Sequence, residues 1–380
     1  MSLNSSSDTL AKSSSQRRAR PPLLSIVVPT FNERANVQEV VRRLDERLAG
    51  LEWEVVFVDD DSTDGTPQAL RDLSQFDARV RFLHRIGRRG LASAVAEGIL
   101  STSAPFVAVM DADLQHDEGQ LVEMLERLRS SSCDIVVGSR YLVAGGVDGW
   151  DKSRQAVSRV ATKLAHLLLK TELSDPMSGF FMLRRDAFDR SVRRLSNLGY
   201  KILLDILVSA RPTLRVAEIP YVFRTRIHGE SKLDSAVALE YLMLLLDKTV
   251  GRIVPVHFVM FMLVGGLGVF VHMLTLAGLN QALDLSFMVS QTVGTFVAMT
   301  FNFFANNVLT YRDKRLKGFW RILWGLLSFY AICSIGAISN VGIAAFLFTR
   351  DYSWWLSGFS GILLAAVWNY AVSSIFTWRK

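Results

Sequence analysis

The chain has 380 residues, of which 50% are hydrophobic and 21% are charged, and its formal net charge is +7. Only 11 Asp, Glu, Lys and Arg residues lie in the last 128 positions. A single soluble globular domain does not divide in this way, and a mean hydropathy of +0.24 excludes a disordered chain. We therefore expect a soluble part followed by a membrane part.

The basic excess lies outside the soluble part. It belongs to the first 22 residues and to the membrane part, while residues 23–252 are close to neutral. A nucleic-acid partner is therefore not expected, because nucleic-acid binding domains gather positive charge on one surface. Cys133 and Cys333 lie one in each part, so no disulfide framework is expected either.

The N-terminal residues 1–22 are Ser-rich, carry a short basic cluster and lack the apolar core of a secretory signal, so we expect a disordered leader. From Leu23 onwards, short β-branched runs alternate with longer amphipathic segments. Runs this short are typical of strands buried on both faces of a parallel sheet. The pattern predicts a doubly wound α/β domain over residues 23–232, with strands at 25–28, 53–58, 80–83, 106–110 and 134–138.

The last part of the chain contains four long stretches without Asp, Glu, Lys or Arg. Each exceeds the roughly 20 residues that cross a bilayer core, so residues 253–380 are predicted to form an all-α membrane domain. We expect four transmembrane helices, at about 255–279, 286–309, 323–348 and 354–377. The loop 312–321 is strongly basic, which places this loop, both termini and the α/β domain on the cytoplasmic side.

Two further features of this region allow alternatives. Residues 233–252 are predicted to form an amphipathic helix in the membrane interface, although packing against the sheet is also open. Five asparagines lie within or beside the spans, where interhelical hydrogen bonding is preferred over a passage for a lipid headgroup. These asparagines are Asn302, Asn306, Asn307, Asn340 and Asn369.

Acidic residues follow three of the predicted strands, at 29–33, 59–64 and 111–116. The carboxyl ends of parallel strands meet at one edge of a sheet, where such carboxylates need a cation or hydrogen-bond donors. In an extended segment Asp111, Asp113 and Gln115 would project to one side as three hard oxygen ligands. They predict a Mg²⁺ or Mn²⁺ site, with turn-forming acids as the alternative and a packing or helix-start role for His116.

At this point the sequence resembles a family 2 glycosyltransferase of the GT-A fold, and in particular the dolichol-phosphate mannose synthases and related polyprenyl-phosphate sugar transferases. The similar segments cover residues 27–233 and read VVPTFNERANV, VDDDSTDGT, RRGLASAVAEG, MDADLQH, VVGSRY, DPMSGFFMLRR, GYKILLD and FRTRIHGESKL. The membrane part resembles the GtrA-like four-helix domain through FMLVGGLGVFV, FNFFANNVLTY and NYAVSSIFTW.

The resemblance implies a role for each matching residue. A first group would bind the nucleotide sugar: Pro29, Phe31, Glu33, Val58, Asp60, Asp111, Ala112, Asp113, Lys201, Arg226 and Lys232. Asp111, Asp113 and Gln115 would hold the metal and, with Arg140, act in catalysis. Arg140, Arg154 and Ser158 would receive the phosphate of the lipid acceptor. Asp205 could orient a group in the site, although a helix-surface acid is preferred, and Gly179 could serve only as a turn residue.

The implied reaction is inverting transfer of a hexose, mannose from GDP-mannose, to dolichyl or polyprenyl phosphate at the cytoplasmic membrane face. A phosphate monoester is ionised at pH 7, so no strong general base is needed. A UDP-sugar transferase is the alternative within this class, and a glycolipid flippase or a scaffold with a degenerate domain are the non-enzyme alternatives. The resemblance places the protein in a prokaryotic plasma membrane, or in the endoplasmic reticulum of a eukaryote, with oligomers possible through the membrane domain.

Overall fold

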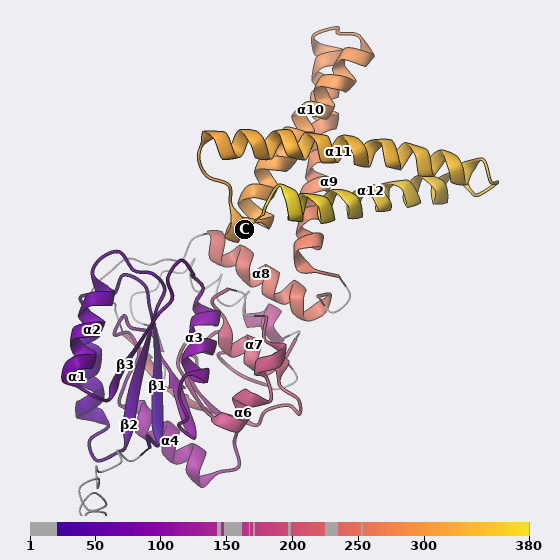
Figure 1. The fold of residues 1–380 in the computed structure, drawn as a ribbon. Coiled ribbons are helices and arrows are strands. Elements are labelled where there is room, and N and C mark those ends of the chain that lie inside the picture. The colour runs from indigo at the N-terminus through magenta and orange to yellow at the C-terminus, as the bar shows by residue number, and fades with distance from the viewer. Residues whose placement is uncertain are drawn as a thin grey trace, which may run out of the picture. The chain divides into compact units, whose positions relative to one another are not determined.

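The structure is a computed structural model that describes residues 21–142, 146–147, 162–166, 168–169, 172–196, 199–224, 235–251 and 254–379. The chain divides into two compact units, one ending at Thr249 and the other beginning at Val250. Most of the predicted leader lies outside the described residues. Each unit is described by itself, and Figure 1 shows the elements of both.

The first unit contains a mixed seven-stranded sheet in the order β3-β2-β1-β4-β7-β5-β8. All five strands expected from the sequence form, and the described residues contain four further strands that were not foreseen. Only β7 runs antiparallel to its neighbours β4 and β5, so the sheet is not wholly parallel. The bounds are β1 Leu24–Thr30, β2 Trp53–Asp59, β3 Val80–His84, β4 Phe106–Val109, β5 Ile135–Ser139, β7 Phe181–Arg184 and β8 Val216–Pro220, with β6 Gly146–Val147 pairing with β9 Val222–Phe223 in a separate ribbon.

Helices cover both faces of this sheet (Figure 1). Strand alternation decides the sides: Ile26 and Val28 face one core and Val27 faces the other. The first core is closed by α1 Val37–Arg47, α2 Thr66–Phe76 and α4 Gln120–Ser130. The second is closed by α3 Leu91–Leu100, α6 Arg185–Asp189 and α7 Ile202–Ser209, with the 3₁₀ turn η1 Val192–Arg194 between the last two. The α/β architecture predicted from the sequence is confirmed.

One edge of the sheet collects the chain segments that carry the acidic motifs. The parallel strands β1, β2, β4 and β5 all end there. Because β7 is antiparallel and Phe181 pairs with Val109 at the end of β4, the segment that enters β7 lies at the same edge. Residues 174–180 are therefore brought beside the exits of β4 and β5.

The helix α8, Ser235–Thr249, packs against α7 within the first unit (Figure 1). Leu244 is buried against Leu204, and Asp205, which is fully buried, pairs with Lys248 at 2.5 Å. The expectation that Asp205 is a helix-surface acid is wrong, because its side chain is buried and pairs with Lys248 of α8, a helix remote in the sequence but packed against α7. Leu242 remains exposed, so the predicted interfacial location of this helix stays a prediction.

The second unit contains four helices long and apolar enough to span a membrane, as predicted, over Val256–Ala282, Phe287–Thr310, Phe319–Phe348 and Leu356–Phe376. The α-helices are α9 Val256–Ala277, α10 Phe287–Ala305, α11 Phe319–Phe348 and α12 Trp354–Phe376. Two π-helical turns, η2 Gly278–Ala282 and η3 Asn306–Thr310, and one 3₁₀ turn, η4 Arg312–Lys314, follow the first two helices. The third helix begins before its predicted start and includes Arg321.

Asparagine side chains lie against glycines of neighbouring helices in this unit. A Cβ atom placed on Gly268 would lie 2.2 Å from Oδ1 of Asn302, and one on Gly336 would lie 2.2 Å from Oδ1 of Asn369. These two oxygens have no hydrogen-bond partner among the described residues, so interhelical hydrogen bonding does not describe them. Asn307 bonds instead to a residue beyond the last helix, because its Oδ1 accepts from Nε1 of Trp378 at 3.1 Å.

A close backbone approach joins α11 to α12. A Cβ atom on Gly361 would lie 2.5 Å from the carbonyl oxygen of Asn340, whereas one on Gly358, a turn earlier in α12, would meet nothing within 4 Å. Small residues that let membrane helices approach closely are a general means of helix pairing.

We expect Gly361→Ala to destabilise the full-length protein by about 1–3 kcal/mol, because the added methyl group meets a backbone atom that cannot rotate away. Gly358→Ala is the matched control and should be neutral, or stabilising by up to ~1 kcal/mol through helix propensity. The measurement is the thermal unfolding midpoint in detergent. Equal midpoints for both variants would contradict a role of this close approach.

Candidate active site

The loops that follow β1 and β2 are joined by hydrogen bonds. The backbone N–H of Asn32 donates to Oγ of Ser62 at 2.7 Å, and that of Thr63 donates to Oδ1 of Asn32 at 3.0 Å. Asn32 and Asp61 have positive φ values of 56° and 60°, which Asn and Asp tolerate better than most residues. The two loops therefore form one surface at the edge of the sheet.

Much of the acidity after β2 is compensated within the protein. Asp59 accepts from the backbone N–H and hydroxyl of Ser62, and Asp60 accepts from Arg85 and from the N–H of Gly90 at 2.7 Å. Burial raises the pKa of Asp60 against the effect of these donors. Arg85, which is 2% exposed, had no role predicted from the sequence. A metal cation is therefore not required to balance the charge of Asp59 and Asp60.

The remaining residues expected to bind the nucleotide differ in how accessible they are. Phe31 is half-buried, and the guanidinium of Arg89 lies 4.3 Å from its ring centroid. Pro29 is half-buried as well. The carboxylate of Glu33 accepts a hydrogen bond from Nδ2 of Asn36 at 2.7 Å. The side chain of Val58 is fully buried against Gly98 of α3, which argues against a side-chain contact with the nucleotide. Ala112 is 3% exposed, which argues in the same way against contact between its side chain and the nucleotide.

The segment after β4 is a turn rather than an extended strand. Leu114 has a φ of 63°, so the expected alternation of Asp111, Asp113 and Gln115 along one side is wrong. Gln115 donates through Nε2 to the carbonyl of Arg224 at 2.8 Å, which leaves Oε1 as the ligand atom of its amide. The carboxylate of Asp111 is 37% exposed, whereas Asp113 is largely buried.

His116 is a packing residue, as preferred from the sequence. Its ring stacks on Phe180 at 5.1 Å and is 1% exposed. Burial lowers the pKa of His116 to about 4, so the ring is neutral at pH 7. Nδ1 accepts from the backbone N–H of Asp111 at 3.1 Å, which assigns the ring proton to Nε2, 3.8 Å from the carboxylate of Asp111. The ring thereby supports the acidic turn.

Gly179 allows the segment before β7 to approach this turn. A Cβ atom at position 179 would lie 3.1 Å from Oδ2 of Asp111, which is closer than most side chains accept. The glycine is therefore more than a turn residue, because it keeps space beside the exposed carboxylate.

A buried ion pair lies next to this carboxylate. Asp175 is fully buried and accepts two side-chain bonds from Arg140, from Nε at 2.7 Å and from Nη2 at 2.9 Å. Asp175 was quoted within a motif but given no role. Glu218 of β8 in turn accepts from the N–H groups of Ser174 and Asp175, at 3.0 and 3.3 Å. The carboxylates of Asp175 and Glu218 thus fix the orientation of Arg140.

Lys201 lies at the N-terminal end of α7 and faces the same group of charges. Burial and the neighbouring Arg140 lower the pKa of Lys201 to about 8, although Asp111 and Asp175 oppose this effect. Its Nζ donates to the carbonyl of Met177 at 3.4 Å. The structure therefore brings Asp111, Arg140, Asp175 and Lys201 into one electrostatic cluster.

Four residues implied by the resemblance lie outside the described residues: Arg154, Ser158, Arg226 and Lys232. Arg224, two residues before Arg226 in the sequence, donates to Asp117 at 2.9 Å and to Glu118 at 3.4 Å.

The turn after β4, which carries Asp111 and Asp113, suits a metal cation whose remaining ligands come from a substrate and water. No three His, Cys, Asp or Glu side chains gather in a metal-binding arrangement within the described ranges. Mg²⁺ is commonly held by one or two carboxylates with substrate phosphates and water completing its shell, so a third acidic ligand is not needed. The oxygens of Asp111, Asp113 and Gln115 fit that chemistry.

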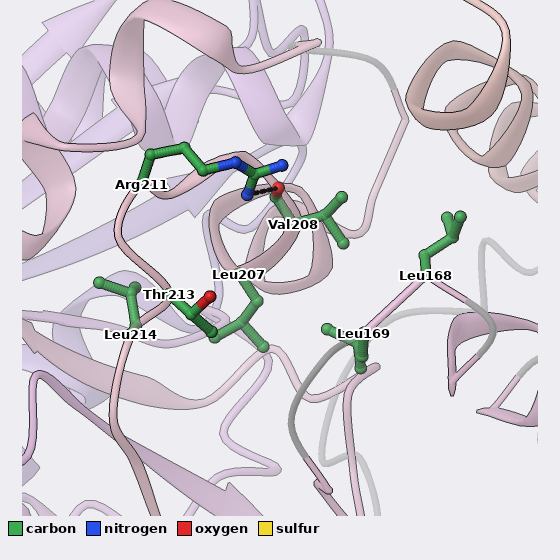
Figure 2. A pocket seen from close by; sticks show the side chains of 7 residues that line it. All are labelled: Leu168, Leu169, Leu207, Val208, Arg211, Thr213 and Leu214. Carbon is green, nitrogen blue, oxygen red and sulfur yellow. Dashed lines mark hydrogen bonds between the residues drawn. The ribbon is translucent and has the colours of Figure 1, made fainter.

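A separate pocket of about 370 Å³, which includes space open to solvent, lies at the C-terminal end of α7 (Figure 2). Its lining is largely apolar, and Arg211 extends across it to donate to the carbonyl of Val208 at 3.0 Å. The other lining residues are Leu168, Leu169, Leu207, Thr213 and Leu214. None of the residues of the electrostatic cluster lines it, so this pocket is not the active site.

Comparison with known proteins agrees with both units. Residues 25–192 match glycosyl transferase family 2, and residues 260–378 match the GtrA/DPMS transmembrane domain. The dolichol-phosphate mannosyltransferase of Pyrococcus furiosus is 33% identical over 359 residues, which are 93% of this chain and 99% of that protein. The chain belongs to the dolichol-phosphate mannosyltransferase family. It is a glycosyltransferase and a membrane protein, as the resemblance implied.

Two fungal members of the family are similar over a smaller share of this enzyme. The dolichol-phosphate mannosyltransferase of Mycosarcoma maydis is 36% identical and covers 64% of this chain and 85% of its own. That of Saccharomyces cerevisiae is 34% identical and covers 57% and 84%. Among solved structures, glucosyl-3-phosphoglycerate synthase from Mycobacterium tuberculosis with Mn²⁺, UDP-glucose and phosphoglyceric acid is 19% identical, covers 60% of this chain and 79% of its own, and has a TM-score of 0.46, too low to bear on the site.

The lowered pKa of Lys201 predicts an alkaline limit for this enzyme. As the pH rises through about 8, the ammonium loses its proton, and kcat/KM for the nucleotide sugar should fall by up to ~10-fold per pH unit. Lys201→Arg keeps its charge, because the pKa of Arg exceeds about 12, so this limb should move out of range while the maximal rate is lower. An identical alkaline limb in both proteins would contradict the role of Lys201.

Proposed function

We propose that this enzyme transfers mannose from GDP-mannose to dolichyl or polyprenyl phosphate with inversion at the anomeric carbon. The observation that carries the proposal is the cluster at one edge of the sheet, where Asp111 lies in the field of Lys201 and of the Arg140–Asp175 pair. An exposed carboxylate beside two cations suits a reaction between two phosphate-bearing substrates, because each negative group finds a positive partner. Family membership supports the same reaction.

On the donor side, we propose that the joined β1 and β2 loops bind the nucleoside. Phe31 offers an apolar ring, and the carboxylates of Glu33 and Asp60 can accept from base N–H or ribose hydroxyl groups. Lys201, with Arg226 and Lys232, would neutralise the diphosphate. Pro29 and the backbone of Val58 and Ala112 would line the site, because the side chains of Val58 and Ala112 are buried.

On the acceptor side, we propose that Arg140 receives the lipid phosphate, together with Arg154 and Ser158. The guanidinium of Arg140 is held from one side by Asp175, so it is pre-oriented before the substrate arrives. A phosphate monoester with a second pKa near 6 is already a nucleophile at pH 7. The attacking oxygen therefore needs positioning rather than deprotonation, which agrees with a neutral, buried His116 that serves packing.

We propose that Mg²⁺ or Mn²⁺ is held by Asp111, Asp113 and Oε1 of Gln115. A divalent cation at these oxygens would neutralise charge on the departing diphosphate. The protein's own contribution is to hold the turn in place, through the contact of His116 with Asp111 and of Gln115 with Arg224.

The membrane part is proposed to present the acceptor. The basic loop 312–321 favours a cytoplasmic position for this loop, for both termini and for the catalytic unit, in a prokaryotic plasma membrane or in the endoplasmic reticulum. The proposed divisions are a leader at 1–22, a catalytic domain at 23–232, an interface helix at 233–252 and a membrane domain at 253–380. Association through the membrane domain is part of this proposal.

A UDP-sugar donor is the second candidate, because Glu33 and Asp60 can accept from uracil as well as from guanine. Purified full-length enzyme should be given polyprenyl phosphate with labelled GDP-mannose, UDP-glucose or GDP-glucose. We expect GDP-mannose to give a kcat/KM at least ~100-fold above the others, as buried polar contacts discriminate strongly. A preference for UDP-glucose would replace the mannosyl assignment, and no lipid-linked sugar from any donor would remove the proposed function.

Asp113→Ala should lower sugar transfer by about 100-fold or more, because a preorganised charge contact at the leaving group is lost. Asp72→Ala, on an exposed position of α2, is the control and should retain full activity. The assay is transfer at saturating substrates, with and without excess EDTA. Undiminished transfer by wild type in EDTA, or full activity of Asp113→Ala, would remove the metal site.

A further inference from the structure

The helix α8 contacts the segment that carries Lys201 at several points. The fully buried carboxylate of Asp205, one turn into α7, receives Nζ of Lys248 at 2.5 Å. The same ammonium donates to the carbonyl of Arg194 at 2.9 Å and to Oγ of Ser209 at 2.8 Å. The side chain of Lys248 is 8% exposed, so this is a buried and fully partnered ion pair rather than a surface contact.

Further contacts hold α8 against residues that precede Lys201 in the chain. Asp205 also accepts from the backbone N–H of Ser196 at 2.8 Å, and the hydroxyl of Ser196 donates to Asp247 of α8. A Cβ atom on Gly199, which has a φ of +70°, would lie 3.2 Å from Cβ of Glu240. Ser196 and Gly199, which precede Lys201 in the chain, are thus held against α8.

Apolar packing joins the same two elements. Leu244 of α8 is 1% exposed and packs in one cluster with Leu204 of α7 and with Met177. The carbonyl of Met177 is the acceptor of Nζ of Lys201. Lys201 precedes the first residue of α7, and its carbonyl accepts from the N–H of Asp205 at 3.1 Å. A shift of α8 would therefore displace both the backbone and the ammonium partner of Lys201.

We propose that Asp205, Asp247 and Lys248 are positioning residues that fix Lys201 for the donor diphosphate, so that α8 is part of the donor site and not only a connection to the membrane unit. This inference rests on the proposed role of Lys201. Breaking a buried ion pair leaves an uncompensated charge, and displacement of a binding group by about 1 Å can reduce activity up to ~100-fold. The effect should fall on the donor, because the contacts converge on Lys201.

Lys248→Met in the full-length enzyme should raise the KM for the nucleotide sugar about tenfold, with kcat and the KM for the lipid phosphate changed less than ~3-fold. Lys248→Arg should restore most of the donor affinity, because a cation again reaches Asp205. A stability control is Val40→Ala, whose side chain is buried in α1 against the opposite face of the sheet. It should lower the unfolding midpoint without changing the donor KM.

Two outcomes would overturn the inference. One is an unchanged donor KM in Lys248→Met, and the other is an equal rise in Val40→Ala at a matched loss of stability. If Lys248→Met does not fold, Ser196→Ala, which removes only the contact with Asp247, should raise the donor KM about 3-fold; no rise there would also overturn it. Lys201→Gln separates the two proposals, because an unchanged donor KM in that variant would remove the role of Lys201 itself.

Discussion

The antiparallel strand β7 between β4 and β5 is the constraint on which the candidate site depends. In a wholly parallel sheet, the residues before each strand lie at the edge opposite the strand exits. Because β7 is reversed, Asp175 and Gly179 precede it at the edge where β4 delivers Asp111 and β5 delivers Arg140. The Arg140–Asp175 pair joins the segment after β5 to the segment before β7, and Glu218 joins the latter to β8, so these charges are held by a rigid sheet.

The same arrangement divides the acidic residues into two groups. Asp59, Asp60 and Asp175 are buried and accept bonds from protein donors, so part of their charge is balanced within the protein before a substrate binds. Asp111 keeps substantial exposure, as Asp61 does after β2, and Gly179 keeps bulk away from Asp111. A protein that satisfies most of its carboxylates internally can leave one exposed carboxylate available to a substrate-borne charge without a large cost in stability.

The sequence was sufficient for the elements whose signal is local. The five strands with β-branched runs and the four long apolar helices were found, because burial on both faces or in lipid leaves a continuous apolar run. The strand β7 was hidden within a motif, and its direction depends on pairing with distant strands. The positive φ of Leu114 cannot be inferred from a leucine, so the geometry of the Asp111 turn was missed. Arg85 and Asp175 were given no role because their partners are remote in sequence, and Asp205 was misplaced because Lys248 is on another helix.

The contacts of asparagine with glycine bear on how the membrane unit is made. Gly268 and Asn302 lie on the first and second helix of one hairpin, and Gly336 and Asn369 lie on the first and second helix of the next. An asparagine–glycine contact thus occurs within each hairpin, and the second hairpin has another between Asn340 and Gly361. Each pair of helices therefore has the means to associate as soon as both of its members are in the bilayer, before the other hairpin has been synthesised.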